Sequence, residues 1–213
     1  MLRESALRTI AYYNTQRIKL SDSPDYQVQK DATQIVWNDM FDVMAARNEV
    51  ISLDEAKLTV GMYRPFNKMD FLYQKNLIQR TYQQLTLFPT PAYENLCICV
   101  TTGSKFGSFI TEYIPDLHLI GDAQCFPLYW YEENKQEQAN DLFGNANASR
   151  YKRRDGVTDW MLREVRSRFS GARSLTKEDI FYYVYGLLHS TDYRERFADY
   201  LRKSLPRIPI VER

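Results

Sequence analysis

The sequence is poor in the residues that bind metal ions or activate nucleophiles. Among its 213 residues there are two histidines, His118 and His189, and three cysteines, Cys97, Cys99 and Cys125. No histidine lies near the cysteines in the sequence and there is no second cysteine pair, so the spacing of a zinc site is missing. With only two histidines, the sequence also offers few candidates for a Ser-His-Asp triad. We therefore expect reduced, buried cysteines and no metal site.

Long hydrophobic runs and a strong net charge are also missing. No segment approaches the roughly 18 consecutive apolar residues that a membrane span requires, and Met1 to Glu4 does not begin a signal peptide. We therefore expect a cytoplasmic protein without a membrane partner. The formal net charge is only +1, which argues against a protein that binds polyanions over its whole surface.

One segment departs from this balance of charge. Residues 150–173 contain eight Lys or Arg against three Asp or Glu. Within them, the run from Arg150 to Arg154 has the side chains that neutralise phosphates and donate hydrogen bonds to guanine edges. The run is therefore a candidate nucleic-acid contact, although a solvated surface before a helix would have the same composition.

The N-terminal part of the chain has the pattern of helices. Apolar residues recur at helical spacing over residues 4–20 and 33–47, and a polar stretch from Ser21 to Asp25 separates the two. The broad apolar face of the second helix could dock on a neighbouring domain. We divide the chain accordingly into a helical segment, residues 1–50, and a second part, residues 51–213.

Short β-rich runs open the second part. The run from Leu96 to Val100 is apolar on both faces, as expected of a central strand that is covered on both sides. A polar, Asn-rich segment, residues 132–149, follows the runs. The strands are expected at 58–63, 71–73, 96–101, 109–114 and 126–131.

Three helices are expected to close the chain. Thr158 can cap the first, Thr176 with Asp179 three residues later can form a capping box for the second, and Ser190 or Thr191 can begin the third. The sequence thus predicts an α+β fold, with a mixed β-sheet flanked by helices, an N-terminal helical segment and three C-terminal helices.

Two kinds of chemistry can be tested against the sequence. The segment from Thr101 to Gly107 follows a strand but matches neither glycine-rich cofactor motif, so it is a tight turn or a phosphate contact. A magnesium nuclease of the Pro-Asp, Glu-x-Lys type matches Asp116 with Glu133 and Lys135. A second, unrelated match at Asp25 shows how common this pattern is, and a solvated charge cluster is the other interpretation.

Longer motifs in a fixed order are more specific. Together they resemble the C-terminal specificity domain of type ISP restriction-modification enzymes, and the resemblance covers about residues 53–211. The motifs are Tyr63–Lys68, Leu96–Thr101, Pro115–Leu119, Gln124–Tyr131, Arg153–Gly156, Thr176–Gly186, His189-Ser190 with Tyr193-Arg194, and Leu205–Pro209.

The resemblance implies a part of a larger enzyme. Such a polypeptide carries a nuclease, a helicase-like ATP-driven translocase, an adenine-specific DNA methyltransferase and, last, this target-recognition domain. S-adenosylmethionine, ATP and magnesium are implied for the whole enzyme. The chain lacks the cofactor loop and the Asn-Pro-Pro-Tyr-type motif of the methyltransferase, so we expect no catalytic residue and no cofactor here. The implied partners are double-stranded DNA and the upstream methyltransferase domain.

The same resemblance guides the choice of DNA-binding residues. Family members share a framework but must read different sequences, so base readers should lie in the segments that connect the shared motifs. A second hypothesis is an interaction module that docks on the methyltransferase and leaves DNA contact to other domains. The proposed base readers are Ser104, Lys105, Asn145, Asn147, Arg150 and Lys152, and Arg153 with Arg154 would form a phosphate clamp.

Overall fold

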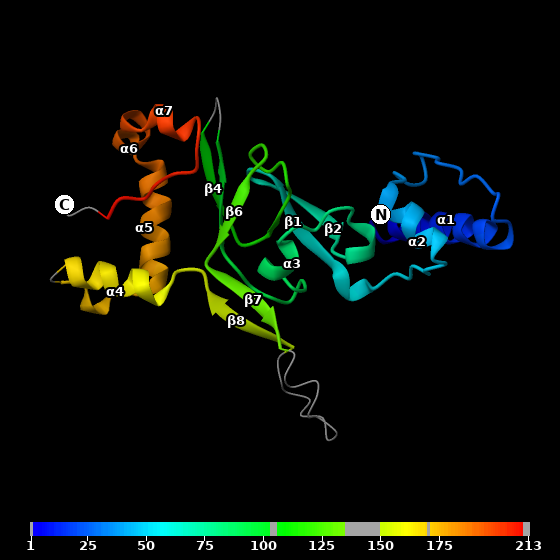
Figure 1. Ribbon diagram of the computed structural model, residues 1–213, viewed down its shortest axis with the longest axis horizontal. Coiled ribbons are helices and arrows are strands. Elements are labelled where there is room, and N and C mark those ends of the chain that lie inside the picture. The colour runs from blue at the N-terminus through cyan, green and yellow to red at the C-terminus, as the bar shows by residue number, and fades with distance from the viewer. Residues whose placement is uncertain (1, 103–105, 135–149, 170, 211–213) are drawn as a thin grey trace, which may run out of the picture. The chain divides into compact units, whose positions relative to one another are not determined.

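The structure of the chain is a computed structural model, drawn in Figure 1. The chain forms two compact units. The structure describes residues 2–102, 106–134, 150–169 and 171–210. The first unit contains Met1–Val60 and Asp70–Tyr82, and the second contains Gly61–Met69 and Gln83–Arg213. Because a compact unit is not by itself a domain, the predicted boundary at residue 50 stays a prediction. Within the described ranges, no helix has both the length and the apolar character needed to cross a membrane.

The first unit is built on a helix pair. Helix α1 (Leu2–Asp22) confirms the first predicted helix and is slightly longer. Helix α2 (Asp39–Ala46) is shorter than predicted, because the side chain of Asn38 accepts hydrogen bonds from the backbone amides of Met40 and Phe41. This N-cap starts the helix at residue 39. The prediction that residues 33–38 are helical is therefore wrong.

The core of this unit is aromatic. Tyr13 of α1 is fully buried, and its ring lies 5.7 Å from that of Trp37 and 5.5 Å from that of Phe41. Its hydroxyl donates a 2.9 Å hydrogen bond to the carbonyl of Glu49. Two residues of the broad apolar face, Trp37 and Phe41, thus contribute to a core inside the chain itself.

Small sheets form the β structure. Strand β3 (Cys97–Thr101) lies between β4 (Gly107–Thr111) and β6 (Gln124–Pro127), and both pairings are antiparallel. Strand β5 (Ile114–Pro115) pairs in parallel with β1. The remaining strands are β1 (Leu58–Arg64), β2 (Asn67–Leu72), β7 (Tyr129–Glu133) and β8 (Tyr151–Asp155), with sheet orders β2-β1-β5, β4-β3-β6 and β7-β8.

One predicted strand, residues 126–131, is divided between β6 and β7. The cause is Asn95, whose side chain accepts a hydrogen bond from the Tyr129 amide and donates one to the Tyr129 carbonyl. The Asn95 oxygen also accepts from the Leu96 amide, and the Leu128 carbonyl accepts from the Gly156 amide, so both groups that would form the reciprocal bond between Leu96 and Leu128 have other partners. The chain leaves that sheet after Leu128, and β7 pairs with β8 instead.

The C-terminal helices follow the predicted caps. Thr158 accepts a hydrogen bond from the Met161 amide, and Thr176 forms the predicted capping box with Asp179. The last predicted helix is two short ones, interrupted at Phe197. The helices of the second unit are α3 (Gln84–Leu87), α4 (Asp159–Arg168), α5 (Lys177–His189), α6 (Thr191–Arg196) and α7 (Ala198–Leu201), and the chain has short 3-10 turns at Glu55–Lys57, Lys75–Leu77 and Ala172–Ser174.

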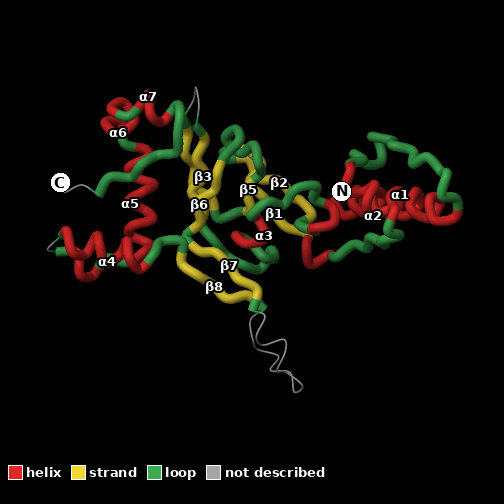
Figure 2. Tube along the Cα trace, viewed as in Figure 1, coloured by secondary structure: helices red, strands yellow, loops and turns green. Residues whose placement is uncertain are grey.

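Helix α5 covers one face of the β4-β3-β6 sheet (Figure 2). Ile98 and Val100 of β3 pack in one buried cluster with Phe181 and Leu188 of α5. The predicted α+β fold is confirmed, and its strands are divided among three sheets instead of one. The β7–β8 ribbon follows directly after β6 in the chain, so it is attached to the part of the structure in which α5 packs on the β4-β3-β6 sheet.

Candidate nucleic-acid interface

Most of the basic run from Arg150 to Arg154 lies in β8, the second strand of a two-stranded ribbon, and Arg150 immediately precedes that strand. Strand β8 pairs antiparallel with β7 in a register that places Trp130 opposite Arg154 and Glu132 opposite Lys152. The backbone amide of Asn134 donates a 2.9 Å hydrogen bond to the carbonyl of Arg150, which extends the pairing beyond the strands. Alternate side chains of a strand point to opposite faces, so the basic residues divide between the two faces of the ribbon.

The inner face of the ribbon is held by tyrosines. The ring of Tyr93 packs edge-on against Tyr131, at 4.9 Å, and against Tyr151, at 5.4 Å. The Tyr131 hydroxyl donates a 2.6 Å hydrogen bond to the Glu94 carbonyl, and partial burial raises the pKa of Tyr131. These contacts fix which face of the ribbon is turned toward the body and which is left to solvent.

The outer face carries Trp130, Glu132, Lys152 and Arg154. Arg154 donates a 2.8 Å hydrogen bond from Nε to the Glu132 carboxylate, and both side chains are more than 40% exposed. The side chain of Lys152 is exposed and makes no hydrogen bond or ion pair with the described residues. Within the described part of the chain, the outer face thus presents one cation without a partner beside a weakly held one, because an exposed ion pair contributes little stability.

The other two basic residues of the run are engaged on the inner face or at the end of the ribbon. The guanidinium carbon of Arg153 lies 4.3 Å from the ring centre of Tyr129. Arg150 forms a 2.9 Å ion pair with Glu133. The predicted phosphate clamp therefore has its two members, Arg153 and Arg154, on opposite faces of the ribbon.

A polar network fixes the base of the ribbon. Lys177 Nζ lies 2.5 Å from the carboxylate of Asp155, the last residue of β8, and 2.6 Å from that of Asp159, the first residue of α4. These hydrogen bonds raise the pKa of Lys177, the Asp155 bond contributing most. Between the two aspartates, the Gly156 amide donates a 2.7 Å hydrogen bond to the Leu128 carbonyl. The end of β8 is therefore tied to β7, α4 and α5 at once.

The connection between β3 and β4 is supported at its described flanks. Ser108 Oγ and His189 Nε2 lie 3.1 Å apart, within hydrogen-bond distance, and the guanidinium of Arg194 lies 5.4 Å from the ring centre of Phe106. Partial burial lowers the pKa of His189, and the positive charge of Arg194 lowers it further. The lowered pKa favours the neutral imidazole, which can donate or accept a hydrogen bond with Ser108.

The described structure covers half of the predicted site. Of the eight predicted residues, it brings Arg150, Lys152, Arg153 and Arg154 together on one ribbon. Ser104, Lys105, Asn145 and Asn147 lie outside the described residues. Asn95 and Tyr93, which hold the ribbon in place, were not predicted, since nothing in their local sequence marks either of them.

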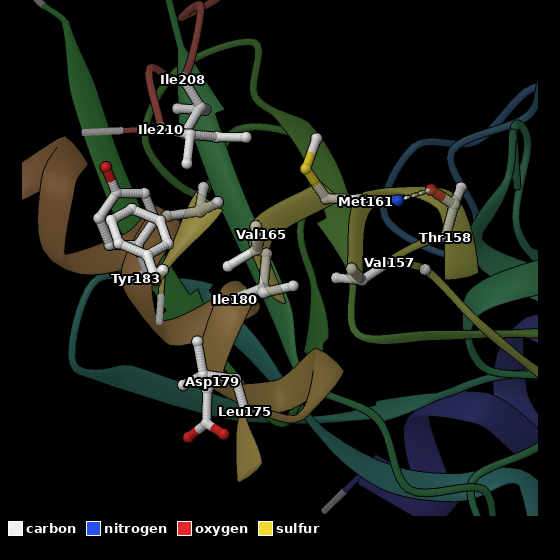
Figure 3. Close-up of a pocket in the computed structure, with 13 residues that line it drawn as sticks. Val157, Thr158, Met161, Val165, Leu175, Asp179, Ile180, Tyr183, Ile208 and Ile210 are labelled. Carbon is white, nitrogen blue, oxygen red and sulfur yellow. Dashed lines mark hydrogen bonds between the residues drawn. The ribbon is translucent and has the colours of Figure 1, made fainter. Parts of the chain in front are cut away.

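A groove of about 590 Å³ lies between α4, α5 and the C-terminal segment (Figure 3). Its lining is mainly apolar, including Val165 of α4 and Ile180 of α5. The polar side chains are engaged: Thr158 accepts from the Met161 amide, Asp179 belongs to the capping box, and Tyr183 donates to the Pro209 carbonyl. The groove therefore does not suit a charged cofactor.

The carboxylates of the nuclease pattern are engaged elsewhere. Asp116 accepts hydrogen bonds from Arg64 and from the His118 amide, and Glu133 pairs with Arg150. The described residues contain no group of three or more Asp, Glu, His or Cys side chains placed to hold a metal ion. Lys135, the third member of the pattern, lies outside the described residues.

Solved structures that resemble the chain include two type ISP restriction-modification enzymes. The ATP-dependent type ISP restriction-modification enzyme LlaBIII bound to DNA is 29% identical, with a TM-score of 0.79 over 99% of this chain. A cryoEM structure of a DrdV-DNA complex is 27% identical, with a TM-score of 0.76 over 95%. A nuclease-deletion mutant of the type ISP enzyme LlaGI, in complex with a DNA substrate mimic, is 29% identical, with a TM-score of 0.72 over 96%.

The matched chains are much longer than this one. The chain covers 13% of the LlaBIII chain, 18% of the DrdV chain and 17% of the LlaGI chain. No curated protein matches the sequence. The family model of the type ISP C-terminal specificity domain matches residues 1–213. The chain therefore belongs to the family of type ISP C-terminal specificity domains, as its ordered motifs predict.

Proposed function

We propose that this chain recognises a specific sequence in double-stranded DNA and that the outer face of the β7–β8 ribbon contacts the duplex. The observation that carries the proposal is the exposed Lys152 side chain, which has no partner among the described residues and lies beside Arg154 on that face. The major groove of B-DNA is wide enough to admit a two-stranded β-ribbon. All three relatives described above were solved with DNA or a DNA mimic.

The two outer cations have different roles in this proposal. Lys152 has no partner to give up among the described residues, so its ammonium can contact a phosphate directly. Arg154 must first leave Glu132, an exposed exchange that costs little. Its planar guanidinium then suits a phosphate or a guanine edge.

The candidate base readers belong to the same proposal. We keep Ser104, Lys105, Asn145 and Asn147 as base readers because their side chains carry suitable donors and acceptors and lie in connecting segments. The segment that contains Asn145 and Asn147 connects the two strands of the ribbon, and the segment that contains Ser104 and Lys105 connects β3 to β4.

Replacing Lys152 by alanine should weaken DNA binding on every sequence. One lost phosphate contact should make the slope of log Kd against log salt shallower by about 1, and should lower affinity about fivefold to tenfold at low salt. The measurement is a salt titration of binding to cognate and random duplexes, made with the chain in its native polypeptide. Lys203→Ala is the matched control, because it removes the same charge from an exposed position two residues after the end of α7. Equal slopes for Lys152→Ala and the unaltered protein would contradict the proposal.

Replacing Asn147 by alanine should instead change site preference. An amide that reads an adenine edge is worth about 1–3 kcal/mol of discrimination against the wrong base pair. The expected result is a loss of preference of about fivefold to 150-fold at one position of the recognised site, with an unchanged salt slope. Selection of binding sites from a random duplex library measures this directly. A uniform loss on all sequences would remove Asn147 from the base readers.

We place the catalytic chemistry in other parts of the polypeptide. An adenine-specific methyltransferase, a helicase-like translocase and a nuclease there would use S-adenosylmethionine, ATP and magnesium. This chain would recognise the DNA sequence on which they act. This chain covers less than a fifth of each of the three similar chains, which supports the proposal that it is part of a larger enzyme. Such an enzyme would act in the cytoplasm.

Docking on the methyltransferase is the second proposed role. The first unit exposes several large apolar side chains to solvent, and burying them against another domain would remove that apolar surface from water. They include Ile18, which is 47% exposed, Val36, which is 78% exposed, and Val50, which is 65% exposed. These residues are candidates for contact with the upstream domain. If docking were the whole function, Lys152→Ala would leave DNA binding unchanged, so the salt titration separates the two roles.

A further inference from the structure

Two cysteines face each other across the β3–β6 pair. Cys99 of β3 and Cys125 of β6 are register partners, and their sulfur atoms lie 3.3 Å apart. Cys97, two residues earlier on β3, is the register partner of Pro127. The described residues contain no metal-binding group of three side chains that would include these thiols. The pair is therefore two thiols in contact, and its chemistry is that of a dithiol.

The position of this pair in the ladder suits a disulfide bond. The Leu128 amide donates a 2.7 Å hydrogen bond to the Leu96 carbonyl, so residues 96 and 128 belong to the hydrogen-bonded positions of the antiparallel ladder. Counting from there, Cys99 and Cys125 stand at a non-hydrogen-bonded position, where Cα atoms are about 4.5 Å apart. A disulfide needs Cα atoms about 4.4–6.8 Å apart, so the bond can close with little movement of the backbone.

We propose that Cys99 and Cys125 are a thiol–disulfide exchange site, which a low-molecular-weight disulfide such as oxidised glutathione converts into an intrachain disulfide. This site goes beyond DNA recognition and does not depend on it. Cys97 should take no part in it, because it faces proline.

The order of the two steps follows from access. Strand β6 lies at the edge of its sheet and Cys125 is half-buried, whereas Cys99 on the central strand is fully buried. The hydrogen bond between the two sulfur atoms lowers the pKa of Cys125, and that bond together with burial raises the pKa of Cys99. Cys125 is thus the thiol that an oxidant can reach and the one more readily ionised.

The exchange is balanced in atoms and electrons. The Cys125 thiolate attacks one sulfur of the oxidant, forms a mixed disulfide and expels one thiolate of the reagent. The Cys99 sulfur then attacks Cys125 Sγ, loses its proton, and expels the second reagent thiolate. The two cysteines lose two electrons, the oxidant's disulfide gains them, and the two released thiolates take up the two protons.

The test is oxidation of the folded, reduced chain by oxidised glutathione. After quenching with acid and denaturation, the number of free thiols should fall from three to one, and peptide mass mapping should find a Cys99–Cys125 link. Cys97→Ser is the matched control, since it changes another buried cysteine on the same strand and should still form the link. Cys99→Ala should stop at glutathione bound to Cys125. Phenylarsine oxide, which bridges two adjacent thiols, should protect the pair from alkylation.

Several results would overturn the proposal. One is that three free thiols remain after oxidation of the folded chain. Another is a link that involves Cys97, or one that forms only between chains or only after denaturation. Peptide mass mapping of the oxidised, unaltered chain is sufficient to show whether the Cys99–Cys125 link forms, so the conclusion does not depend on whether a cysteine variant folds.

Discussion

Replacing Gly156 by alanine should destabilise the chain by about 2–3 kcal/mol, because a side chain at this position meets backbone that cannot move aside. A Cβ atom built on Gly156 would lie 2.1 Å from the Pro127 carbonyl oxygen and 3.1 Å from that of Leu128. The close approach is held by the hydrogen bond from the Gly156 amide to the Leu128 carbonyl. Relieving the clash would lengthen or break that bond.

The position of Gly156 connects this stability to the ribbon. It follows the last residue of β8 and lies two residues before Thr158, the N-cap of α4. A shift there would displace the ribbon relative to the helices that support its base. We therefore expect weaker DNA binding by Gly156→Ala with an unchanged salt slope, because no phosphate contact is removed.

Urea denaturation measures the loss of stability. Gly186→Ala is the matched control, because a Cβ on Gly186 would meet nothing within 4 Å and the residue lies inside helix α5. Alanine there should stabilise the chain by about 0.5–1 kcal/mol. An unfolding midpoint for Gly156→Ala equal to that of the unaltered chain would contradict the close approach at this glycine.

Local signals in the sequence predicted the starts of the C-terminal helices and the central strand well. The capping box of Thr176 and Asp179 uses atoms only three residues apart, so its geometry follows from the local sequence alone. Residues 97–100 of the apolar run are buried on both faces of β3, as its unbroken apolar pattern predicts. Such features depend on few neighbours, and this explains why they could be predicted.

Strand β8 was missed because its pattern is not that of a strand. Residues 151–155 are charged on both faces and lack the alternation of apolar and polar residues that marks a half-buried strand. The strand forms because β7 pairs with it and because Tyr93, far earlier in the chain, packs against Tyr151. Without the strand, nothing in the sequence could place Arg153 and Arg154 on opposite faces.

Replacing Asn95 by alanine should cost about 3 kcal/mol or more, since it leaves several buried backbone groups without partners. Asn95 is only 6% exposed. Its amide group donates hydrogen bonds of 2.8 Å to the Leu87 carbonyl and 2.7 Å to the Tyr129 carbonyl. Its oxygen accepts from the amides of Tyr129 and Leu96, at 3.1 and 2.8 Å. All the hydrogen-bonding atoms of the side chain are thus used.

The loss should be concentrated where the ribbon leaves the sheet. Asn95→Ala should increase amide hydrogen exchange at Tyr129 and Leu96 more than elsewhere, and urea denaturation should give the total loss of stability. Asn95→Asp should also destabilise, because a carboxylate has no donor for the two carbonyls that the amide now binds. Asn67→Ala, at an exposed position of β2, should stay within about 0.5 kcal/mol of the unaltered chain. If Asn95→Ala behaved like Asn67→Ala, the division between β6 and β7 would need a cause other than this side chain.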